Sequence, residues 1–261
     1  MKYGLLGEKL GHSHSPRIHA LLGNPEYQLC PLPKEALADF LCKGEFSGMN
    51  VTIPYKQAVI PYLADCSPQA EAIGSVNTIV RTADGRLHGY NTDYFGLRAL
   101  AAHAGLSFAG KKVLVLGSGG TSLTARAVAK DGGAREIVVI SRKGPDNYEH
   151  LDRHSDAELL INTTPVGMFP KTEEAPLSLS HFPRLAGVLD VIYNPLETRL
   201  LREARQRGIR CACGLYMLVA QAKYADDLFF HRTRSDELID EVYETLYREL
   251  SGRTASAEKE T

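Results

Sequence analysis

The sequence predicts an α/β protein of two domains, the second of which is a Rossmann-type, doubly wound nucleotide-binding domain. Three observations support this fold class. Short apolar runs alternate with helical patterns along most of the chain, as in sheets covered by helices. A glycine-rich turn follows the charge-free, β-branched run 113–116 and precedes a helical pattern. The 261 residues are enough for two moderate domains, each with its own core.

Composition and charge argue against several classes of protein. The formal net charge is −1, and no basic stripe interleaved with aromatic residues suggests a nucleic-acid interface. No apolar run is long enough to span a bilayer, and the first 15 residues lack the apolar core of a signal peptide. Five scattered cysteines fit free thiols in a reducing compartment, and no ligand cluster indicates a metal site. We therefore expect a cytoplasmic protein that binds a small molecule, with a homodimer as one option for its oligomeric state.

The first 104 residues alternate between strand and helix patterns, as in βαβ units. Asp84 and Gly85 mark a hairpin turn between the last two strands. The expected strands are 2–7, 27–32, 46–53, 76–82 and 86–92, and the expected helices are 15–22, 34–42 and 94–104.

Polar side chains gather at the strand and loop ends of this first domain, where open α/β sheets bind ligands. Ser13 and Ser15 stand beside a helix start and can receive a carboxylate, although Ser15 also fits a simple helix cap. Lys56 follows the third strand, where a lysine acts as a general acid or base or is only a solvated charge. Asp93 begins a helix, where it fits a helix cap, and this role is compatible with a catalytic one. The remaining polar candidates at these ends are Asn50, Thr52 and Asn77.

The glycine turn at 117–121 is the strongest single motif. It lies between the strand 113–116 and the helical pattern 121–130, so its backbone N–H groups are open to a dinucleotide pyrophosphate. The third glycine of the usual pattern is Ser122 here, and a turn that serves packing alone is the alternative. The candidate cofactor-binding residues of the turn are Gly117, Ser118, Gly119, Gly120 and Thr121.

The residues after the next strand, 136–140, indicate which dinucleotide binds. A NAD-binding unit usually offers an aspartate or glutamate there to the ribose hydroxyls. This chain has Ser141, Arg142 and Lys143 instead, and cations suit the 2′-phosphate of NADP. A solvated basic turn is the alternative.

Three further strands are expected at 159–163, 188–192 and 210–213. Their carboxyl ends fall on the sheet edge where the nicotinamide is expected. The candidates at these ends are Thr163, Ile192 and Gly214 for the cofactor and Tyr193 for the substrate.

The C-terminal part of the chain is expected to be helical. A helix over 196–207 is followed by Gly208, and the next helix, from Leu215, carries Gln221. Ser235 is expected to cap a last helix that ends at Gly252 and packs back on the first domain. The apolar stripe of that helix is Leu238, Val242, Leu246 and Leu250. The predicted division is 1–93 with about 225–252 for a substrate-binding domain, 94–224 for an NADP-binding domain, and 253–261 for a disordered tail.

Eight motifs resemble, in order and spacing, those of the shikimate dehydrogenase family: GHSHSP, NVTIPYK, GSVNT, GYNTD, GSGGTS, NTTPVGM, DVIYNP and GLYMLVAQA. The resemblance extends from the first strand to about Ala222. It implies a two-domain enzyme that reduces 3-dehydroshikimate with NADPH in aromatic amino-acid biosynthesis, with Lys56 and Asp93 as the catalytic pair. It also implies that Ser13 and Ser15 hold the substrate carboxylate. The ring hydroxyls would be bound by Asn50, Thr52, Asn77, Asp93 and Gln221.

The sequence departs from the family in two places. Ser141 replaces an asparagine that often precedes Arg142, and the C-terminal aromatic signature is missing from a chain with no tryptophan. Two other functions stay open: a dehydrogenase that acts on quinate, or on both acids with NAD, and a catalytically silent NADP-binding sensor. Retention of both Lys56 and Asp93 argues against the sensor.

Overall fold

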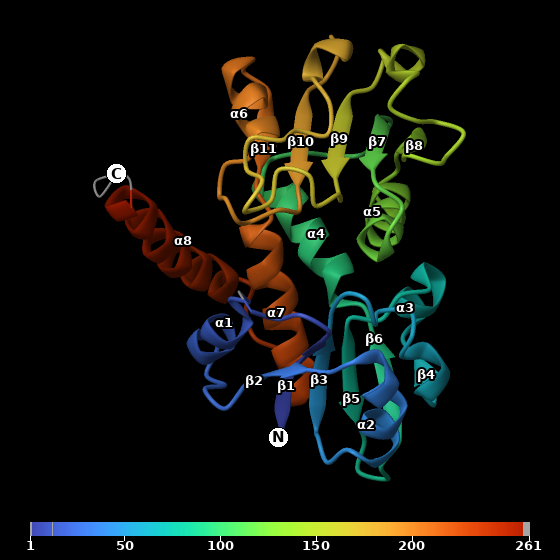
Figure 1. Cartoon of the computed structure of the whole chain (residues 1–261), viewed down its shortest axis with the longest axis vertical. Helices are drawn as coiled ribbons and strands as arrows, with labels where there is room; N and C mark the ends of the chain where they lie inside the picture. The colour runs from blue at the N-terminus through green and yellow to red at the C-terminus, as the bar shows by residue number, and fades with distance from the viewer. Residues whose placement is uncertain (1, 12, 258–261) are drawn as a thin grey trace. The chain divides into compact units, whose positions relative to one another are not determined.

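The chain forms two compact units (Figure 1). The structure, a computed structural model, describes residues 2–11 and 13–257. The first unit contains Met1–Phe95 with Val219–Leu246, and the second contains Gly96–Leu218 with the chain from Tyr247. The predicted domain boundaries, after residues 93 and 224, lie inside helices α4 (Thr92–His103) and α7 (Leu215–Phe229), which contribute to both units. Those boundaries stay predictions.

The first unit contains a six-stranded mixed sheet with the strand order β2-β1-β3-β5-β6-β4. β1 runs parallel to β2 and β3, whereas β5 runs antiparallel to β3 and β6. The predicted hairpin joins β5 to β6, and Gly85 adopts a left-handed conformation there that costs glycine little. The strands are β1 (Tyr3–Gly7), β2 (Gln28–Pro31), β3 (Gly48–Val51), β4 (Asp65–Cys66), β5 (Thr78–Arg81) and β6 (Leu87–Tyr90).

Short helices connect the parallel strands of the first unit. α1 (Ser15–Leu21) lies between β1 and β2, and α2 (Leu37–Lys43) lies between β2 and β3, with its first turn wound as the 3₁₀ helix η1 (Lys34–Ala36). In the described part of this unit, three elements were not predicted from the sequence: the 3₁₀ helix η2 (Ile60–Tyr62), β4 and α3 (Pro68–Ile73). These are two to six residues long, too short to show a hydrophobic period.

The sheet of the first unit is packed on both faces. Along β1 the side chains alternate, so that Leu6 packs with α2 residues such as Leu41. Tyr3 packs on the other face with Ala225 and Phe229 of α7. The polar residues of this unit that we predicted as ligands therefore project from a rigid, two-sided core.

The second unit contains a five-stranded parallel sheet with the order β11-β10-β9-β7-β8 (Figure 1). The chain passes from β8 to β9 across β7, so the strand order reverses between β7 and β9. In open α/β sheets, ligands bind at this reversal, beyond the carboxyl ends of the strands. The strands are β7 (Lys112–Leu116), β8 (Glu136–Ile140), β9 (Leu159–Asn162), β10 (Gly187–Asp190) and β11 (Arg210–Ala212).

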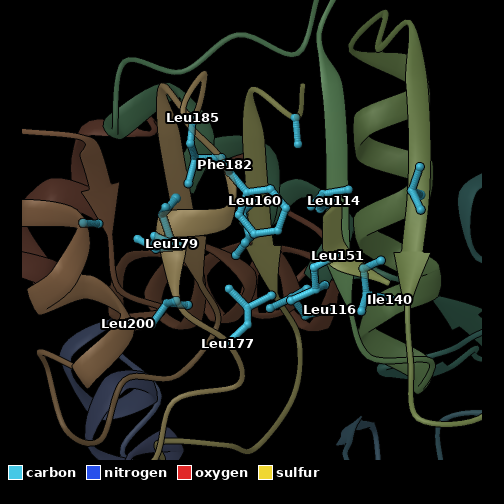
Figure 2. Close-up of a cluster of buried hydrophobic side chains, with 14 of the residues drawn as sticks. Leu114, Leu116, Ile140, Leu151, Leu160, Leu177, Leu179, Phe182, Leu185 and Leu200 are labelled. Atoms are coloured by element: carbon cyan, nitrogen blue, oxygen red, sulfur yellow. The ribbon is translucent and has the colours of Figure 1, made fainter. Parts of the chain in front are cut away.

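The connection from β9 to β10 is largely irregular and still supplies core side chains. Figure 2 shows Leu177, Leu179 and Phe182 of this connection meeting Leu114 and Leu160 of the sheet. The regular crossover helices are α5 (Gly120–Asp131) after β7 and α6 (Arg199–Gln206) after β10, with the 3₁₀ helices η3 (Leu151–His154) and η4 (Leu179–His181) in the other connections. The sheet's fold class is the one predicted from the sequence.

The first half of the last helix, α8 (Glu237–Ala257), packs in the first unit, as predicted. Ile239, Val242 and Leu246 are its buried apolar residues. A helix turns once every 3.6 residues, so a strict four-residue repeat drifts around its surface. For this reason Leu238 and Leu250, the ends of the predicted stripe, are only partly buried.

α8 continues past Gly252, although the sequence predicts that the helix ends there and that a disordered tail follows. A glycine ends a helix when it adopts the left-handed conformation, whereas a glycine that stays helical costs about 1 kcal/mol relative to alanine. Gly252 stays helical, so the prediction for 253–257 was wrong. The rest of the predicted tail, 258–261, lies outside the described residues. Within residues 2–11 and 13–257, no helix, α8 included, has an apolar stretch of membrane-spanning length.

Candidate active site

Lys56 and Asp93 form an ion pair in the first unit. Lys56 Nζ lies 2.6 Å from Asp93 Oδ2, and the two side chains are 15% and 10% exposed. Lys56 is therefore not a solvated surface charge. A charge-assisted hydrogen bond of this length, largely shielded from water, holds the ammonium in one position.

The backbone of the loop after β3 is anchored around Lys56. The Val76 N–H donates to the Lys56 carbonyl at 2.8 Å. The preceding residue, Tyr55, is buried, and its hydroxyl donates to the Leu32 carbonyl at 2.6 Å. Because the loop is bonded to residues just after β2 and just before β5, the ammonium is presented from an anchored backbone.

Asn91, not Asp93, caps helix α4. The Tyr94 N–H donates to Asn91 Oδ1 at 3.1 Å, and Asn91 Nδ2 donates to the Ser75 carbonyl at 2.8 Å. Asp93 lies in the first helical turn, where the helix dipole favours a carboxylate. The capping role considered for Asp93 was wrong, and its carboxylate meets Lys56 instead.

Asn77 joins three elements near this pair. Its Oδ1 accepts the Thr92 N–H at 2.7 Å, and its Nδ2 donates to Thr92 Oγ1 at 3.0 Å. The same Nδ2 lies 3.5 Å from Gln221 Oε1, on α7. The predicted residues Asn77 and Gln221 thus lie close together. Asn77 is also bonded to Thr92, which directly precedes Asp93.

Asn50 is held in a single orientation. Its Oδ1 accepts the Tyr27 hydroxyl at 2.7 Å, and its Nδ2 donates to Thr78 Oγ1 at 3.0 Å. Thr52, two residues further, is next to Gly7, where a Cβ would lie only 2.6 Å from Thr52 Cγ2. The glycine therefore makes room for the threonine at the end of β3.

Ser13 and Ser15 contact each other at the start of α1. Ser13 Oγ donates to Ser15 Oγ at 3.1 Å and accepts the Ser15 N–H at 3.2 Å. The helix starts at Ser15 itself, with His14 at the cap position and no capping side chain, so the predicted cap role of Ser15 was wrong. The described hydrogen bonds join the two serines to each other and do not link them to the ion pair.

The glycine turn of the second unit leaves the start of α5 open. Gly117 has φ +103°, which glycine adopts without strain, and a Cβ there would lie 3.0 Å from Thr163 Oγ1. Gly119 caps α5, and nothing lies within 4 Å of a Cβ built on it. The first turn of α5 contains no acidic residue. The turn, with Ser118, Gly120 and Thr121, therefore has the space and the helix dipole that a pyrophosphate requires.

The basic turn Ser141, Arg142 and Lys143 directly follows β8. The Ser141 N–H donates to the Asp146 carbonyl at 3.2 Å, which closes the turn, and both cations are exposed. β8 is the neighbour of β7, so the basic turn and the glycine turn follow adjacent strands at one sheet edge. Two cations in that position suit a ribose 2′-phosphate.

The other predicted cofactor residues lie at the same edge. Thr163 Oγ1 donates to the Leu116 carbonyl at 2.5 Å, and the Gly214 N–H donates to the Ile192 carbonyl at 2.8 Å. A Cβ at Gly214 would lie 2.0 Å from the Val191 carbonyl oxygen, so only glycine fits. Burial raises the pKa of the Tyr193 hydroxyl, which keeps that side chain a neutral donor.

A buried polar pair at this edge was not found from the sequence. Asn162 and Asp190 are the last residues of β9 and β10, and Asn162 Nδ2 donates to Asp190 Oδ1 at 3.0 Å. The Ile192 N–H and the Thr198 hydroxyl donate to the same carboxylate, at 3.0 and 2.8 Å. Burial nevertheless raises the pKa of Asp190 to about 6. The sequence feature that could have indicated this pair is a polar residue at the end of an otherwise apolar strand. Asn162 in NTT and Asp190 in DVIY have that position.

The amino-acid sequence of the chain is similar to the sequences of known enzymes. Residues 5–79 match the family model for the shikimate dehydrogenase substrate binding domain. A shikimate dehydrogenase (NADP(+)) of Clostridium perfringens is 35% identical over 94% of this chain and 97% of its own length. The chain belongs to the shikimate dehydrogenase family.

The fold of the chain is also similar to solved structures of related enzymes. Shikimate 5-dehydrogenase from Thermus thermophilus, in complex with NADP(H) and shikimate, has a TM-score of 0.81 and 31% identity over 94% of this chain and 99% of that one. Quinate dehydrogenase from Corynebacterium glutamicum, in complex with NAD, has a TM-score of 0.82 and 27% identity over 95% and 99%. The predicted family and the two-domain α/β fold class are confirmed.

Asp190 makes stability depend on pH. Its pKa is 3.8 in an unfolded chain and about 6 in the folded protein, so the folded state holds the proton more tightly. Stability therefore falls as the pH rises from about 4 to about 6, by about 3 kcal/mol in all. We expect Asp190→Asn to remove this fall, which urea unfolding of both proteins at about pH 4 and about pH 7 measures. The exposed Asp152 provides the control, Asp152→Asn. Parallel pH profiles for the wild type and Asp190→Asn would contradict the assignment.

Proposed function

We propose that this protein catalyses the reversible, NADPH-dependent reduction of 3-dehydroshikimate to shikimate, with Lys56 and Asp93 as its acid–base pair. One observation carries the proposal: in a member of this family, the ammonium of Lys56 lies 2.6 Å from Asp93, and both side chains are largely buried. A surface lysine would exchange partners with water, whereas the ammonium of Lys56 is held at a defined position by Asp93. A defined proton donor is what carbonyl reduction needs.

The proposed chemistry requires one hydride and one proton. NADPH, when bound, supplies the hydride to the carbonyl carbon. As the C=O π bond breaks, negative charge develops on the oxygen, and the Lys56 ammonium stabilises that charge and donates the proton. In the reverse direction neutral Lys56 accepts the hydroxyl proton. Asp93 keeps the lysine oriented in both directions.

The substrate would be held by the polar groups of the first unit. Ser13 and Ser15 offer two adjacent hydroxyls for the carboxylate, and their mutual hydrogen bond keeps them together. Asn50, Thr52, Asn77 and Gln221 would bind the ring hydroxyls. The side-chain amides of Asn50 and Asn77 are already oriented by hydrogen bonds to Tyr27 and Thr92, respectively, before the substrate binds. Tyr193 is proposed as a further substrate-binding residue.

NADP would be held by the second unit. The open backbone at Gly119 would take the pyrophosphate, and Arg142 and Lys143 the 2′-phosphate. Thr163, Ile192 and Gly214 would border the nicotinamide at the strand ends. The close approach of the Val191 carbonyl to Gly214 leaves no room for a side chain on that side.

A second candidate function is oxidation of quinate with NAD, which the similarity to the Corynebacterium glutamicum enzyme favours. The turn Ser141, Arg142 and Lys143 after β8 contains two exposed cations and no carboxylate. This composition argues against NAD as the cofactor. The silent-sensor alternative conflicts with a preserved, preorganised Lys56–Asp93 pair. The cytoplasmic location and the homodimer stay predictions.

The proposed activity is tested by steady-state rates of the purified protein on shikimate and on quinate, each with NADP and with NAD. We expect kcat/KM for shikimate with NADP to exceed the other three values. Higher values for quinate with NAD would replace the proposal by the second candidate. No turnover in any of the four would favour a sensor.

Replacing Lys56 by alanine removes the proposed proton donor. We expect kcat to fall by about 10²- to 10⁴-fold or more, while shikimate affinity, measured by calorimetry, changes only a few fold. Lys43→Ala, which removes an exposed lysine of the same unit, is the matched control. A folded, fully active Lys56→Ala protein would refute the assignment.

Replacing Arg142 by alanine removes a proposed contact to the 2′-phosphate. We expect KM for NADPH to rise by about 10- to 100-fold and KM for NADH to change little, because only NADPH carries the phosphate. Arg207→Ala, an exposed arginine just after α6, is the control. Equal effects on both cofactors would mean that Arg142 does not read the phosphate.

A further inference from the structure

The first unit contains a cavity that has no part in the proposed reaction. Its volume is about 660 Å³, and its lining comes from the start of α3, the end of β6, the start of α4, and α7 with the loop that follows. Neither Lys56 nor Asp93 lines it. Ligand pockets commonly have volumes of about 300–1,000 Å³ and combine apolar walls with a few polar groups.

One wall of this cavity is aromatic. Tyr90, Phe95 and Tyr224 line it together with Leu228, and all four are only partly buried. The rings of Phe95 and Tyr224 have centroids 5.4 Å apart at an angle of 48°. Flat rings pack well against such tilted aromatic surfaces, so the wall favours an aromatic ligand.

Among the described residues that line the cavity, three are cations, and two of these have every side-chain nitrogen bound by the protein. Lys223 Nζ contacts the Arg234 carbonyl at 2.6 Å, Asp236 Oδ1 at 2.9 Å and Asp227 Oδ2 at 3.0 Å, which uses its three donors. Each guanidinium nitrogen of Arg234 also has a partner: Asp227, Asp226 and the Leu22 carbonyl. These two side chains stabilise the cavity floor and have little capacity for a ligand.

Arg232, the third cation, has N–H donors for which no described residue provides an acceptor. Its Nη2 donates to Asp226 at 2.7 Å, and its side chain is 40% exposed. A guanidinium has five N–H donors in a plane, and its remaining edge matches a carboxylate. The acidic residues of the lining cannot serve a cation equally well, because Asp236 already accepts from Lys223 and from the Tyr224 hydroxyl and Asp227 accepts from Lys223 and Arg234.

We propose that this cavity binds a small aromatic carboxylate, with the ring against Tyr90, Phe95 and Tyr224 and the carboxylate on Arg232. The site would lie beside the first turn of α4, because Asn91 and Thr92 also line the cavity. Thr92 is also hydrogen-bonded to Asn77 of the proposed substrate site. The two sites would therefore share a wall while taking different ligands.

Indole-3-acetate is a direct probe, since the chain has no tryptophan and only the probe contains an indole. Excitation at the red edge of indole absorption excites the probe alone, and its fluorescence anisotropy is followed as protein is added. We expect saturable binding with Kd of about 1 mM or tighter, the affinity typical of a ligand of this size. 3-Methylindole, without the carboxylate, and tryptamine, with an ammonium in its place, should each bind at least about 10-fold more weakly.

Arg232→Gln should weaken indole-3-acetate binding by about 10-fold or more, and Arg232→Lys should restore part of it. Arg86→Gln removes an exposed arginine elsewhere in the unit and should leave Kd unchanged. Asp226 keeps Arg234 as a partner in the Arg232 variants, so the fold should survive, which circular dichroism checks. The proposal fails if tryptamine binds as well as indole-3-acetate, if Arg232→Gln binds like Arg86→Gln, or if shikimate displaces the probe.

Discussion

The hydrogen bonds between Asn77 and Thr92 are the constraint on which the first unit's site depends. Both residues are buried, and a buried amide left without partners costs about 1–3 kcal/mol. The start of the hairpin strand β5 and the start of α4 therefore stay together. Asp93 follows Thr92 directly, so its direction toward Lys56 is set by these bonds. The arrangement of the proposed catalytic pair thus depends on residues that need not touch the reacting atoms.

The second unit uses the same solution at a different sheet edge. A parallel strand loses its ladder partners at its carboxyl end, and the loop that follows needs new ones. Asn162 and Asp190 provide them, since their side chains bind the loops after β9 and β10. Burying a carboxylate there costs stability at neutral pH, and in return the strand ends around the proposed nicotinamide position are held rigidly.

Regular and strongly patterned elements could be predicted from the sequence. The strand predicted at 136–140 is β8, and the strand, glycine turn and helix around Gly117 are present as predicted. The failures have local causes. α3 and β4 are too short to show a hydrophobic period, and Gly252 stays helical. At the start of α4, the side chain of Asn91 rather than that of Asp93 caps the helix. The repeated Asn-Thr pair in GSVNT and GYNTD was visible, but nothing in the sequence said that these two pairs bind each other.

The sequence by itself determined the features that depend on neighbouring residues: apolar strands, a glycine turn, a basic turn after β8, and motifs specific enough to identify the family. Tertiary structure alone decided which charges and amides meet. Lys56 and Asp93 are 37 residues apart, and Asn77 and Gln221 are 144 apart. Backbone conformation follows from local sterics, whereas these pairings depend on strand order and register, which exist only once the sheet has formed.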